Sequence, residues 1–414
     1  MTSNYDLLIV GGGAAGLMSA TIVQNKGLRV GLLERNARIG KKLLATGNGR
    51  CNYTNIYTSL EDFSGEDVSF ASTALETFPP QTILSYFRSL GIEPQIEANG
   101  KAFPSSEQAS SFLDLFLLRL RNGDIDILTD TFVKGIRKKK GRFIVTTNDG
   151  RNLTAKKVLL CTGGKAMPSS GSDGNGYSLA ASLGHSITPL SPSLVQLMLQ
   201  GNFFPKIEGV KLRRWLHLGL GDEFLQTEEG DLLFANYGIS GPPALQLSRL
   251  AGALLAQGKT PWVSISLFNE PLQETYERLM ERSSFFPDRS IHDALIGLVH
   301  KRLIPVIIQE AGIDNIRRTV SSLTKKETYS LARLLTDWRI PIRGLKGWSS
   351  AQVTAGGVNT KEVDPASMES TIISGLYFAG EILDIDGRSG GFNLQWAWSS
   401  AAIASRAIIS DCQS

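Results

Sequence analysis

The chain has 414 residues, which is too long for a single compact core and predicts two or three domains. Its hydrophobic fraction of 42% and charged fraction of 20% are typical of a globular protein. The formal net charge of +4 tolerates an anionic partner without requiring one, and no segment has the ~20 uninterrupted apolar residues of a membrane span.

The cysteines and the N-terminal segment indicate the cellular compartment. Cys51, Cys161 and Cys412 lie far apart and form no C-x-x-C motif, so neither a disulfide framework nor a thioredoxin-type redox pair is expected. The N-terminal segment carries Asp6 where a secretory signal needs cations. We therefore expect a cytoplasmic protein.

The first elements along the chain predict a β-α-β unit. Tyr5 to Val10 has the apolar run of a buried strand, Ala14 to Lys26 is a helix of small residues, and Leu28 to Leu33 is a second strand. Between the first strand and the helix lies a G-x-G-x-x-G motif, Gly11 to Gly16. This context predicts a dinucleotide-binding turn.

Each glycine of the motif has its own expected role. Gly11 permits the tight turn, Gly13 lets the backbone approach a pyrophosphate, and Gly16 allows the helix to pack closely on the strand. Glu34 ends the second strand, where a carboxylate can accept both hydroxyls of an adenosine ribose. The helix N-terminus then faces the phosphate charge.

The middle of the first half contains a candidate functional loop and further strands. Residues Gly40 to Asn55 form a Gly- and Asn-rich loop that is long for a connection. Helical periodicity follows in Gln81 to Leu90 and Ser110 to Arg121, and Asp126 to Asp149 predicts strands joined by a basic turn. A buried strand then ends at Cys161. The next residues, Thr162, Gly163 and Gly164, are expected to return the chain to the cofactor.

After Pro189 the pattern changes. Ser193 to Phe268 alternates short apolar runs with turns, as in a β-rich domain, and Leu272 to Thr336 is largely helical. The order of strand, glycine turn and helix resumes near Ser350. We therefore predict a discontinuous nucleotide-binding domain with two inserted parts. The expected ranges are 1–190 and 347–414 for the nucleotide-binding domain, 191–270 and 325–346 for a β-barrel insert, and 271–324 for a helical insert.

A second cofactor motif is expected near the C-terminus. Gly380 and Glu381 follow a buried strand, and Gly390 to Leu394 precede a helix. The acid can bind a ribityl chain, and the helix N-terminus can face the N1/O2 edge of a flavin. A nicotinamide enzyme does not need this second element, so the pair of motifs indicates FAD. Glu381 as a simple helix-capping acid is the alternative.

Several further motifs carry a family resemblance. Together with the closing stretch from Gly380 to Gln395, they resemble the BaiN-type (YhiN-like) family of NAD(P)/FAD-dependent oxidoreductases. The resemblance covers nearly the whole chain and implies an α/β fold: a glutathione-reductase-like Rossmann FAD domain with an inserted β-barrel and helical domain. The motifs are Lys41-Lys42, Gly47-Asn48-Gly49-Arg50-Cys51-Asn52, Gly238-Ile239-Ser240-Gly241-Pro242, Thr354-Ala355-Gly356-Gly357-Val358 and Met368-Glu369-Ser370.

The resemblance also implies residues of the FAD site. Phe392 stands where the family has a tyrosine, a change of little expected consequence. Val133 would act through its backbone beside the adenine. The residues implied by the family are Ala15, Glu34, Arg35, Lys41, Lys42, Val133, Glu381, Asn393 and Leu394. To these the motifs add Gly11, Gly13, Ala14, Gly16, Thr162, Gly163, Gly164 and Gly380.

Arg50, Cys51 and Asn52 are the candidate catalytic residues, because their loop can run toward the flavin. Arg50 could hold an anionic substrate or stabilise an oxyanion, and Cys51 could protonate the carbon opposite hydride delivery. Alternatively the loop only shapes the FAD pocket and Cys51 is buried and inert. The four histidines are scattered and predict no metal site.

The expected activity is flavin-mediated reduction of an activated C=C bond. The family includes enzymes for conjugated bonds of steroid-like acids, for a uridine of ribosomal RNA, and for small aminoketones. Uridine reduction is the leading hypothesis, with NAD(P)H as an optional transient reductant. The rivals are a flavin oxidase of an amine or aminoketone, an enone reductase, and an FAD-stabilised RNA-binding or assembly protein without turnover. Basic clusters at Lys134 to Arg142, Lys211 to Arg214, Arg317-Arg318 and Lys325-Lys326 are either phosphate contacts or solvated surface.

Overall fold

The chain forms two compact units. The computed structural model describes residues 4–121 and 123–413. The first unit contains the chain up to Pro192 and again from Trp348, and the second unit is Ser193–Gly347. The first unit is thus assembled from two stretches that are far apart in sequence.

A mixed seven-stranded sheet forms the centre of the first unit. Its strands are β1 (Asn4–Val10), β2 (Val30–Leu33), β7 (Ile125–Leu128), β8 (Val133–Lys139), β9 (Arg142–Thr147), β10 (Asn152–Leu160) and β19 (Leu376–Phe378). The order is β7-β2-β1-β10-β9-β8, and β19 also pairs with β10. β7, β2, β1, β10 and β19 are parallel, whereas β8 and β9 are antiparallel. Fully buried parallel strands require continuous apolar runs, which Leu7–Val10 and Val158–Leu160 supply.

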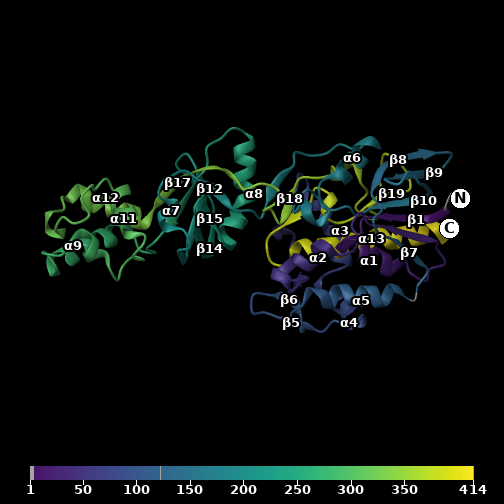
Figure 1. Ribbon diagram of the computed structural model, residues 1–414, viewed down its shortest axis with the longest axis horizontal. Coiled ribbons are helices and arrows are strands. Elements are labelled where there is room, and N and C mark those ends of the chain that lie inside the picture. The colour runs from purple at the N-terminus through teal and green to yellow at the C-terminus, as the bar shows by residue number, and fades with distance from the viewer. Residues whose placement is uncertain (1–3, 122, 414) are drawn as a thin grey trace. The chain divides into compact units, whose positions relative to one another are not determined.

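The described part of the first unit also contains seven helices of α type. They are α1 (Ala14–Val23), α2 (Lys41–Ala45), α3 (Ser72–Thr77), α4 (Pro80–Ser89), α5 (Ala109–Arg121), α6 (Asn175–Ser182) and α13 (Phe392–Gln413). α1 and α13 lie side by side although they come from opposite ends of the chain, and the Ser19 hydroxyl donates to the carbonyl of Ala401 at 3.5 Å (Figure 1). Small residues on α1 permit this close packing. The helix ends before the expected Lys26, because Asn25 and Gly27 adopt φ of +59° and +76°.

Short strands hold the loops of the first unit. β3 (Thr54–Asn55), β6 (Lys101–Pro104) and β5 (Pro94–Ile96) form one small sheet, and β4 (Phe63–Ser64) pairs with β20 (Asp386–Gly387). β11 (Ser191–Ser193) lies at the unit boundary, and β18 (Val353–Ala355) follows the return to the first unit. These strands fix the loop after α2, which the sequence marks as functional, to the rest of the unit.

The second unit contains a closed barrel. Its strands are β12 (Leu197–Leu199), β13 (Lys211–Leu220), β14 (Glu223–Ala235), β15 (Gly238–Ser240), β16 (Trp262–Ser266) and β17 (Trp338–Leu345). Along β17, Trp338, Ile340 and Ile342 are buried while the residues between them are exposed, so the strand presents one side to the barrel interior. Trp338 packs there against Phe203 and Phe234.

The second unit also contains helices, two of which lie in the stretch predicted as strands and turns. They are α7 (Phe204–Ile207), α8 (Pro242–Ala256), α9 (Leu272–Phe285), α10 (Ile291–Leu295), α11 (Ile304–Glu310) and α12 (Lys325–Thr336). The apolar pattern predicts only strands and turns where α8 lies, although a proline at the first helical position starts the helix.

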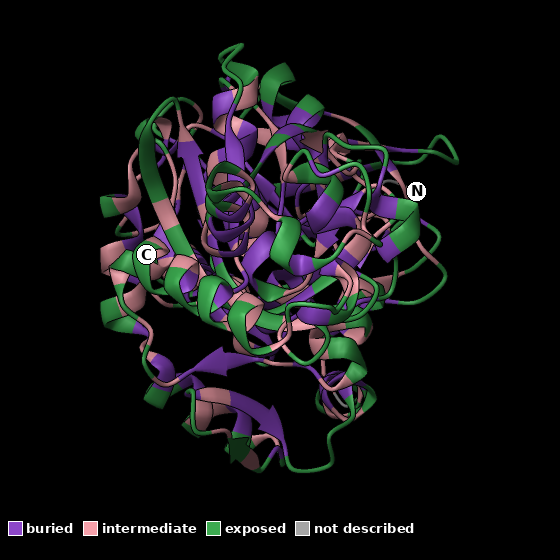
Figure 2. Cartoon of the chain, turned by 90° about the vertical axis from the view of Figure 1, so that its left-hand side faces the viewer, coloured by how far each residue is buried: buried purple, intermediate pink, exposed green. Residues whose placement is uncertain are grey.

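The amphipathic helix α12 lies in the stretch Leu272 to Thr336 that was predicted as largely helical, and β17, which follows it, is a barrel strand. Thr324 and Glu327 form a capping box at its start. Buried and exposed residues alternate along such helices (Figure 2). None of the described helices is long and apolar enough to cross a membrane.

Candidate functional site

The glycine motif forms the turn between β1 and α1, and its glycines meet different surroundings. Gly11 has φ of +110°, and a Cβ there would lie 2.4 Å from the carbonyl oxygen of Cys161. A Cβ on Gly16 would lie 1.8 Å from the carbonyl oxygen of Gly11. Next to Gly13, by contrast, no described atom lies within 4 Å of a Cβ. The packing of the protein therefore explains Gly11 and Gly16, while the open space beside Gly13 fits a phosphate that approaches the backbone.

Glu34 lies at the end of β2 and is buried. Its Oε2 accepts a hydrogen bond from the Gly12 N–H at 3.0 Å, and its Oε1 accepts from the N–H and the side-chain amide of Asn36 at 2.8 and 2.7 Å. The Asn36 amide also donates to the carbonyl of Ser170 at 2.9 Å. Asn36 thus orients the carboxylate, and it was not among the predicted residues. Its place two residues after Glu34, where a short amide can reach back, was the available signal.

Arg35 and Val133, both predicted to line the FAD site, contact residues around the start of α6. The Arg35 guanidinium pairs with Asp173 at 2.5 Å and lies over the Phe132 ring at 4.7 Å. The backbone oxygen of Val133 accepts from the side chain of Asn175 at 3.2 Å. These contacts bring the start of β8 and the end of β2 to the same segment. Lys41 is exposed at the first residue of α2 and takes no part in this group.

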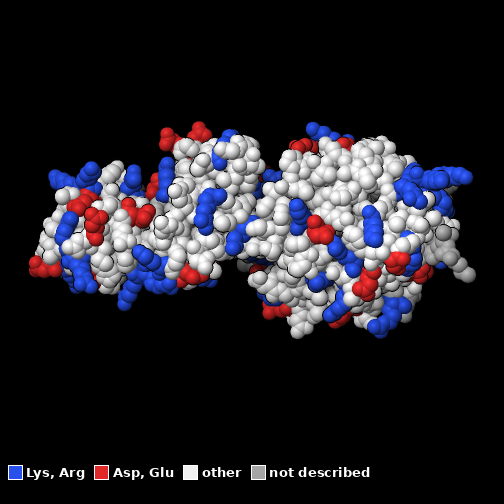
Figure 3. Space-filling model, turned by 45° about the horizontal axis from the view of Figure 1, so that its top comes forward, with Lys and Arg blue, Asp and Glu red and all other residues white. Residues whose placement is uncertain are grey.

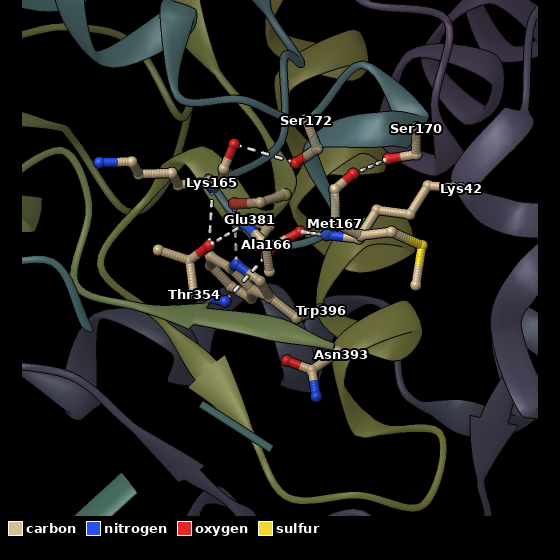
Figure 4. Close-up of polar contacts among 12 residues, drawn as sticks. Lys42, Lys165, Ala166, Met167, Ser170, Ser172, Thr354, Glu381, Asn393 and Trp396 are labelled. Atoms are coloured by element: carbon tan, nitrogen blue, oxygen red, sulfur yellow. Dashed lines mark hydrogen bonds and ion pairs between the residues drawn. The ribbon is translucent and has the colours of Figure 1, made fainter. Parts of the chain in front are cut away.

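Glu381 joins three segments that are distant in sequence (Figure 4). Its Oε2 pairs with Lys42 Nζ at 2.6 Å, and its Oε1 accepts from the Thr354 N–H at 2.9 Å. The Thr354 hydroxyl oxygen accepts in turn from the N–H groups of Lys165 and Ala166 at 2.7 and 3.0 Å. Lys42 and Glu381 are thereby brought together as predicted site residues, and Thr354 is an additional member.

Gly163 and Gly164 lie against the same carboxylate. A Cβ on Gly164 would be 2.9 Å from Glu381 Oε1 and 2.3 Å from the Thr354 hydroxyl, so a larger residue would push into the group. Thr162, before them, carries a buried hydroxyl that has no partner among the described residues. An unsatisfied buried hydroxyl beside a predicted cofactor segment fits a ligand that supplies the missing partner.

The two cofactor motifs meet between α1 and α13. Gly380 has φ of +78°, and a Cβ on it would lie 3.1 Å from the Cβ of Ala15, the second residue of α1. Trp396 donates from its indole N–H to the Gly380 carbonyl at 3.2 Å and so fixes α13 to this turn. The starts of α1 and α13 therefore lie on either side of Gly380. Helix N-termini carry partial positive charge, which suits a nucleotide pyrophosphate and a reduced flavin.

Asn393 and Leu394 occupy the first turn of α13. The Asn393 side chain accepts from the Gly387 N–H at 2.9 Å and donates to the Gly387 carbonyl at 2.7 Å. It therefore closes the loop before the helix, and any cofactor contact would come from the backbone of this turn. Leu394 is partly buried. Ala14 and Ala15 take the corresponding place at the start of α1.

The contacts of Arg50 and the burial of Cys51 differ from what the catalytic hypothesis requires. The Arg50 guanidinium pairs with Glu97 at 3.4 Å and Glu107 at 3.3 Å and lies over the Phe103 ring at 4.1 Å. Cys51 is fully buried, and burial raises the pKa of its thiol to about 12, although a hydrogen bond with Thr46 opposes this shift. A thiol of that pKa donates protons poorly at neutral pH, so these contacts favour the structural alternative for both residues.

Together these groups fit FAD. The open space beside Gly13, the starts of two helices, the buried Glu34 and the Lys42–Glu381 pair form a continuous set within the first unit. Within residues 4–121 and 123–413, no three His, Cys, Asp or Glu side chains are grouped as a metal site would require.

His185 is a buried titratable group outside this arrangement. Its Nδ1 lies 3.1 Å from Glu362 Oε2 and its Nε2 lies 2.8 Å from the Ser370 hydroxyl. Burial lowers the pKa of His185, and the facing Glu362 carboxylate offsets only part of this shift. The histidine is thus neutral and ties α6 to the segment before β19.

We expect His185 to make the protein less stable in mild acid. The unfolded chain binds a proton on this histidine at pH below about 6.5, whereas the folded state resists it, so the free energy of unfolding falls as the pH drops through that range. His185→Gln should remove this part of the pH dependence. Denaturant midpoints at pH 7.5 and 5.5 test it, with His300→Gln as the control. Equal pH dependence in the wild type and His185→Gln contradicts the assignment.

The family match and the similarity to known proteins are consistent with this arrangement. Residues 5–407 match the family described as HI0933-like protein Rossmann domain. The chain is 36% identical over 407 residues to a 3-dehydro-bile acid delta(4,6)-reductase of Clostridium scindens, covering 96% of this chain and 98% of that protein. It is 30% identical over 408 residues to the ribosomal RNA dihydrouridine synthase of Escherichia coli, covering 98% of each.

A solved structure shares the fold. A variant of the FrdA subunit of Escherichia coli quinol fumarate reductase aligns with 100% of this chain and 71% of its own, at a TM-score of 0.51 and 16% identity. This likeness agrees with the predicted α/β Rossmann fold, while the family match and the named reductase confirm the oxidoreductase class and the FAD cofactor. The BaiN-type resemblance is confirmed as well, and the chain belongs to the HI0933-like family of FAD-dependent oxidoreductases.

Proposed function

We propose that the protein reduces a C=C bond that is conjugated to a carbonyl group. The observation that carries the proposal is the polar group around Glu381, Lys42 and the start of α13, which lies beside the nucleotide turn in the same unit. The relatives support the reaction class. A delta(4,6)-reductase and a dihydrouridine synthase both saturate a double bond activated by a carbonyl.

The residues of the site have separate roles in this reaction. Bound FAD supplies hydride transfer at N5. Gly13 and the start of α1 would hold its pyrophosphate, and Glu34 would hold its adenosine ribose. The positive end of α13 and the Lys42 ammonium favour the negative charge of the reduced ring. With NAD(P)H as the reductant, the net reaction would consume NAD(P)H and one proton, and the substrate would gain one hydride and one proton across its double bond.

A uridine of ribosomal RNA is the leading substrate of this proposal. Two relatives named ribosomal RNA dihydrouridine synthase, from Escherichia coli and Haemophilus influenzae, match along 98% and 97% of this chain. A steroid-like enone is the second candidate, which the 36% identical reductase favours. Activity on ribosomal RNA would also agree with the cytoplasmic location expected from the sequence.

The basic cluster of β13 contributes less to RNA binding than its sequence suggests. Lys211 pairs with Asp231 at 2.8 Å and Arg213 pairs with Glu229 at 3.2 Å, both across the β13–β14 hairpin. Acidic side chains are likewise interspersed among the basic ones on the face shown in Figure 3. A phosphate would therefore compete with carboxylates at these positions, so the Lys211–Arg214 cluster supports the solvated-surface alternative.

Nucleoside analysis separates the candidates. We expect ribosomal RNA from cells without the gene to lose dihydrouridine and to regain it with the wild-type gene but not with a variant that cannot bind FAD. The parallel assay mixes the reduced protein with enone or RNA in the absence of oxygen and follows reoxidation of the flavin. Unchanged dihydrouridine with rapid enone turnover selects the small-molecule substrate.

Other outcomes contradict the proposal. If an amine reduces the flavin and oxygen reoxidises it with release of hydrogen peroxide, the protein is an oxidase. If a variant that cannot bind FAD restores dihydrouridine to cells without the gene, the protein acts as a binding or assembly factor without turnover. Either result rejects reduction of a conjugated C=C bond as the function.

A further inference from the structure

The loop after α2 holds Asn52 in a fixed position. Cys51, just before it, adopts φ of +63° while fully buried, and its N–H donates to the Thr46 carbonyl at 3.0 Å. A Cβ on Gly47 would lie 2.6 Å from the Asn52 nitrogen, so only glycine fits there. A strained backbone that its surroundings hold in place is typical of a functional segment.

This loop is attached to the start of α13. The Thr54 hydroxyl donates to Gln395 Oε1 at 2.5 Å, and the Asn55 amide donates to the Gly390 carbonyl at 3.2 Å. A Cβ on Gly391 would lie 2.4 Å from the Thr54 carbonyl oxygen and 2.9 Å from Asn52 Oδ1. The side-chain oxygen of Asn52 therefore lies directly beside the residue that precedes α13.

That oxygen is buried and has no hydrogen-bond partner among the described residues. Buried acceptors are nearly always satisfied, and leaving one unsatisfied costs about 1–3 kcal/mol. The neighbouring cation cannot supply the bond, because Arg50 is turned toward Glu97 and Glu107. A ligand that reaches the start of α13 could supply the missing donor.

We propose that Asn52 is a cofactor-binding residue whose side-chain oxygen accepts a hydrogen bond from the N3–H of the flavin ring. The pyrimidine edge of the oxidised ring has a single N–H, N3–H, between two carbonyl oxygens. A carboxamide matches this pattern, since its oxygen accepts from N3–H while its NH₂ group can donate to an adjacent carbonyl. The inference depends on FAD binding but not on the substrate that is reduced.

The test uses 3-methyl-FAD, in which a methyl group replaces the N3 hydrogen. FAD-free protein is titrated with FAD and with 3-methyl-FAD, and binding is followed by flavin fluorescence. We expect the wild type to bind FAD about tenfold more tightly than the methylated form, the difference of one hydrogen bond. In Asn52→Ala this preference should fall to about twofold or less, because the acceptor is gone.

Two further variants complete the experiment. Asn52→Asp keeps an oxygen acceptor and should keep the preference for FAD. Asn48→Gly lies in the same loop, at an exposed residue with φ of +56°, and should behave as the wild type. Thermal unfolding of the FAD-free variants shows that each is folded.

The proposal is wrong if the wild type binds both flavins equally, a result that requires no variant. It is also wrong if Asn52→Ala discriminates as strongly as the wild type. If FAD affinity is unchanged in Asn52→Ala while KM for a uracil-containing substrate rises, the oxygen serves the substrate and the flavin assignment is rejected. The flavin-binding readouts do not depend on whether the protein reduces a conjugated C=C bond.

Discussion

Gly13→Ala is expected to weaken FAD binding at least about 100-fold while leaving the FAD-free protein folded. The added methyl group meets no described atom within 4 Å, and Gly13 has φ of −82°, which alanine adopts without strain. The methyl would instead fill the space through which the pyrophosphate approaches the backbone, and a 100-fold loss corresponds to about 2.8 kcal/mol. Titration with FAD and thermal unfolding of the FAD-free protein measure the two effects separately.

Two other glycines provide controls for this experiment. Gly135→Ala, in β8, also places its methyl in open space and should change neither FAD affinity nor stability. Gly16→Ala should destabilise the FAD-free protein itself, because its methyl would lie 1.8 Å from the Gly11 carbonyl oxygen. Retention of wild-type affinity in Gly13→Ala would show that the cofactor does not approach this turn.

Glu34→Ala should weaken FAD binding and should also lower the stability of the FAD-free protein. The carboxylate is buried and accepts from the Gly12 N–H and from two donors of Asn36, so its removal leaves these donors without an acceptor. Each hydrogen bond to a charged group contributes about 1.5–3 kcal/mol, and the loss is divided between the fold and the ribose contacts. We expect a lower denaturant midpoint without FAD and a further loss of FAD affinity.

Matched variants show whether this effect is specific. Glu34→Gln keeps the shape but can direct an NH₂ group at the Gly12 N–H, so it should resemble Glu34→Ala in FAD affinity. Glu107→Gln changes an exposed acid that pairs with Arg50 and should leave FAD affinity unaltered. If Glu34→Ala releases no FAD but lowers stability, the carboxylate is structural and the ribose is bound elsewhere.

The sequence alone predicts those structural features that depend on residues close together in the chain. The buried strands are continuous apolar runs, and the turn at Gly11 depends on a positive φ that glycine provides. The same reasoning missed α8, because its apolar residues follow two prolines after a β-rich stretch and resemble further short strands. The domain limits remain a prediction, which limited proteolysis near residues 191 and 346 would test.

Other members of the site could not be found from local patterns. Thr354 contacts Glu381 through its backbone N–H and the residues after Gly164 through its hydroxyl, so its role exists only after three distant segments meet. Asn36 is similar, because its amide joins Glu34 to the Ser170 carbonyl. The catalytic hypothesis for Arg50 and Cys51 followed from their position in a loop, whereas ion pairs and burial decide what each side chain can do.

The pairing of β19 with β10, and of α13 with α1, affects how the protein matures during translation. The N-terminal glycine turn is synthesised long before β19 and α13, which are separated from it by the whole second unit. Until they emerge from the ribosome, β10 has an open edge and α1 exposes the surface that α13 later covers, both of which favour aggregation of a nascent chain. We therefore expect FAD to bind only after α13 has been synthesised, and a chain that ends within the second unit should lack the part of the site formed by Glu381 and α13.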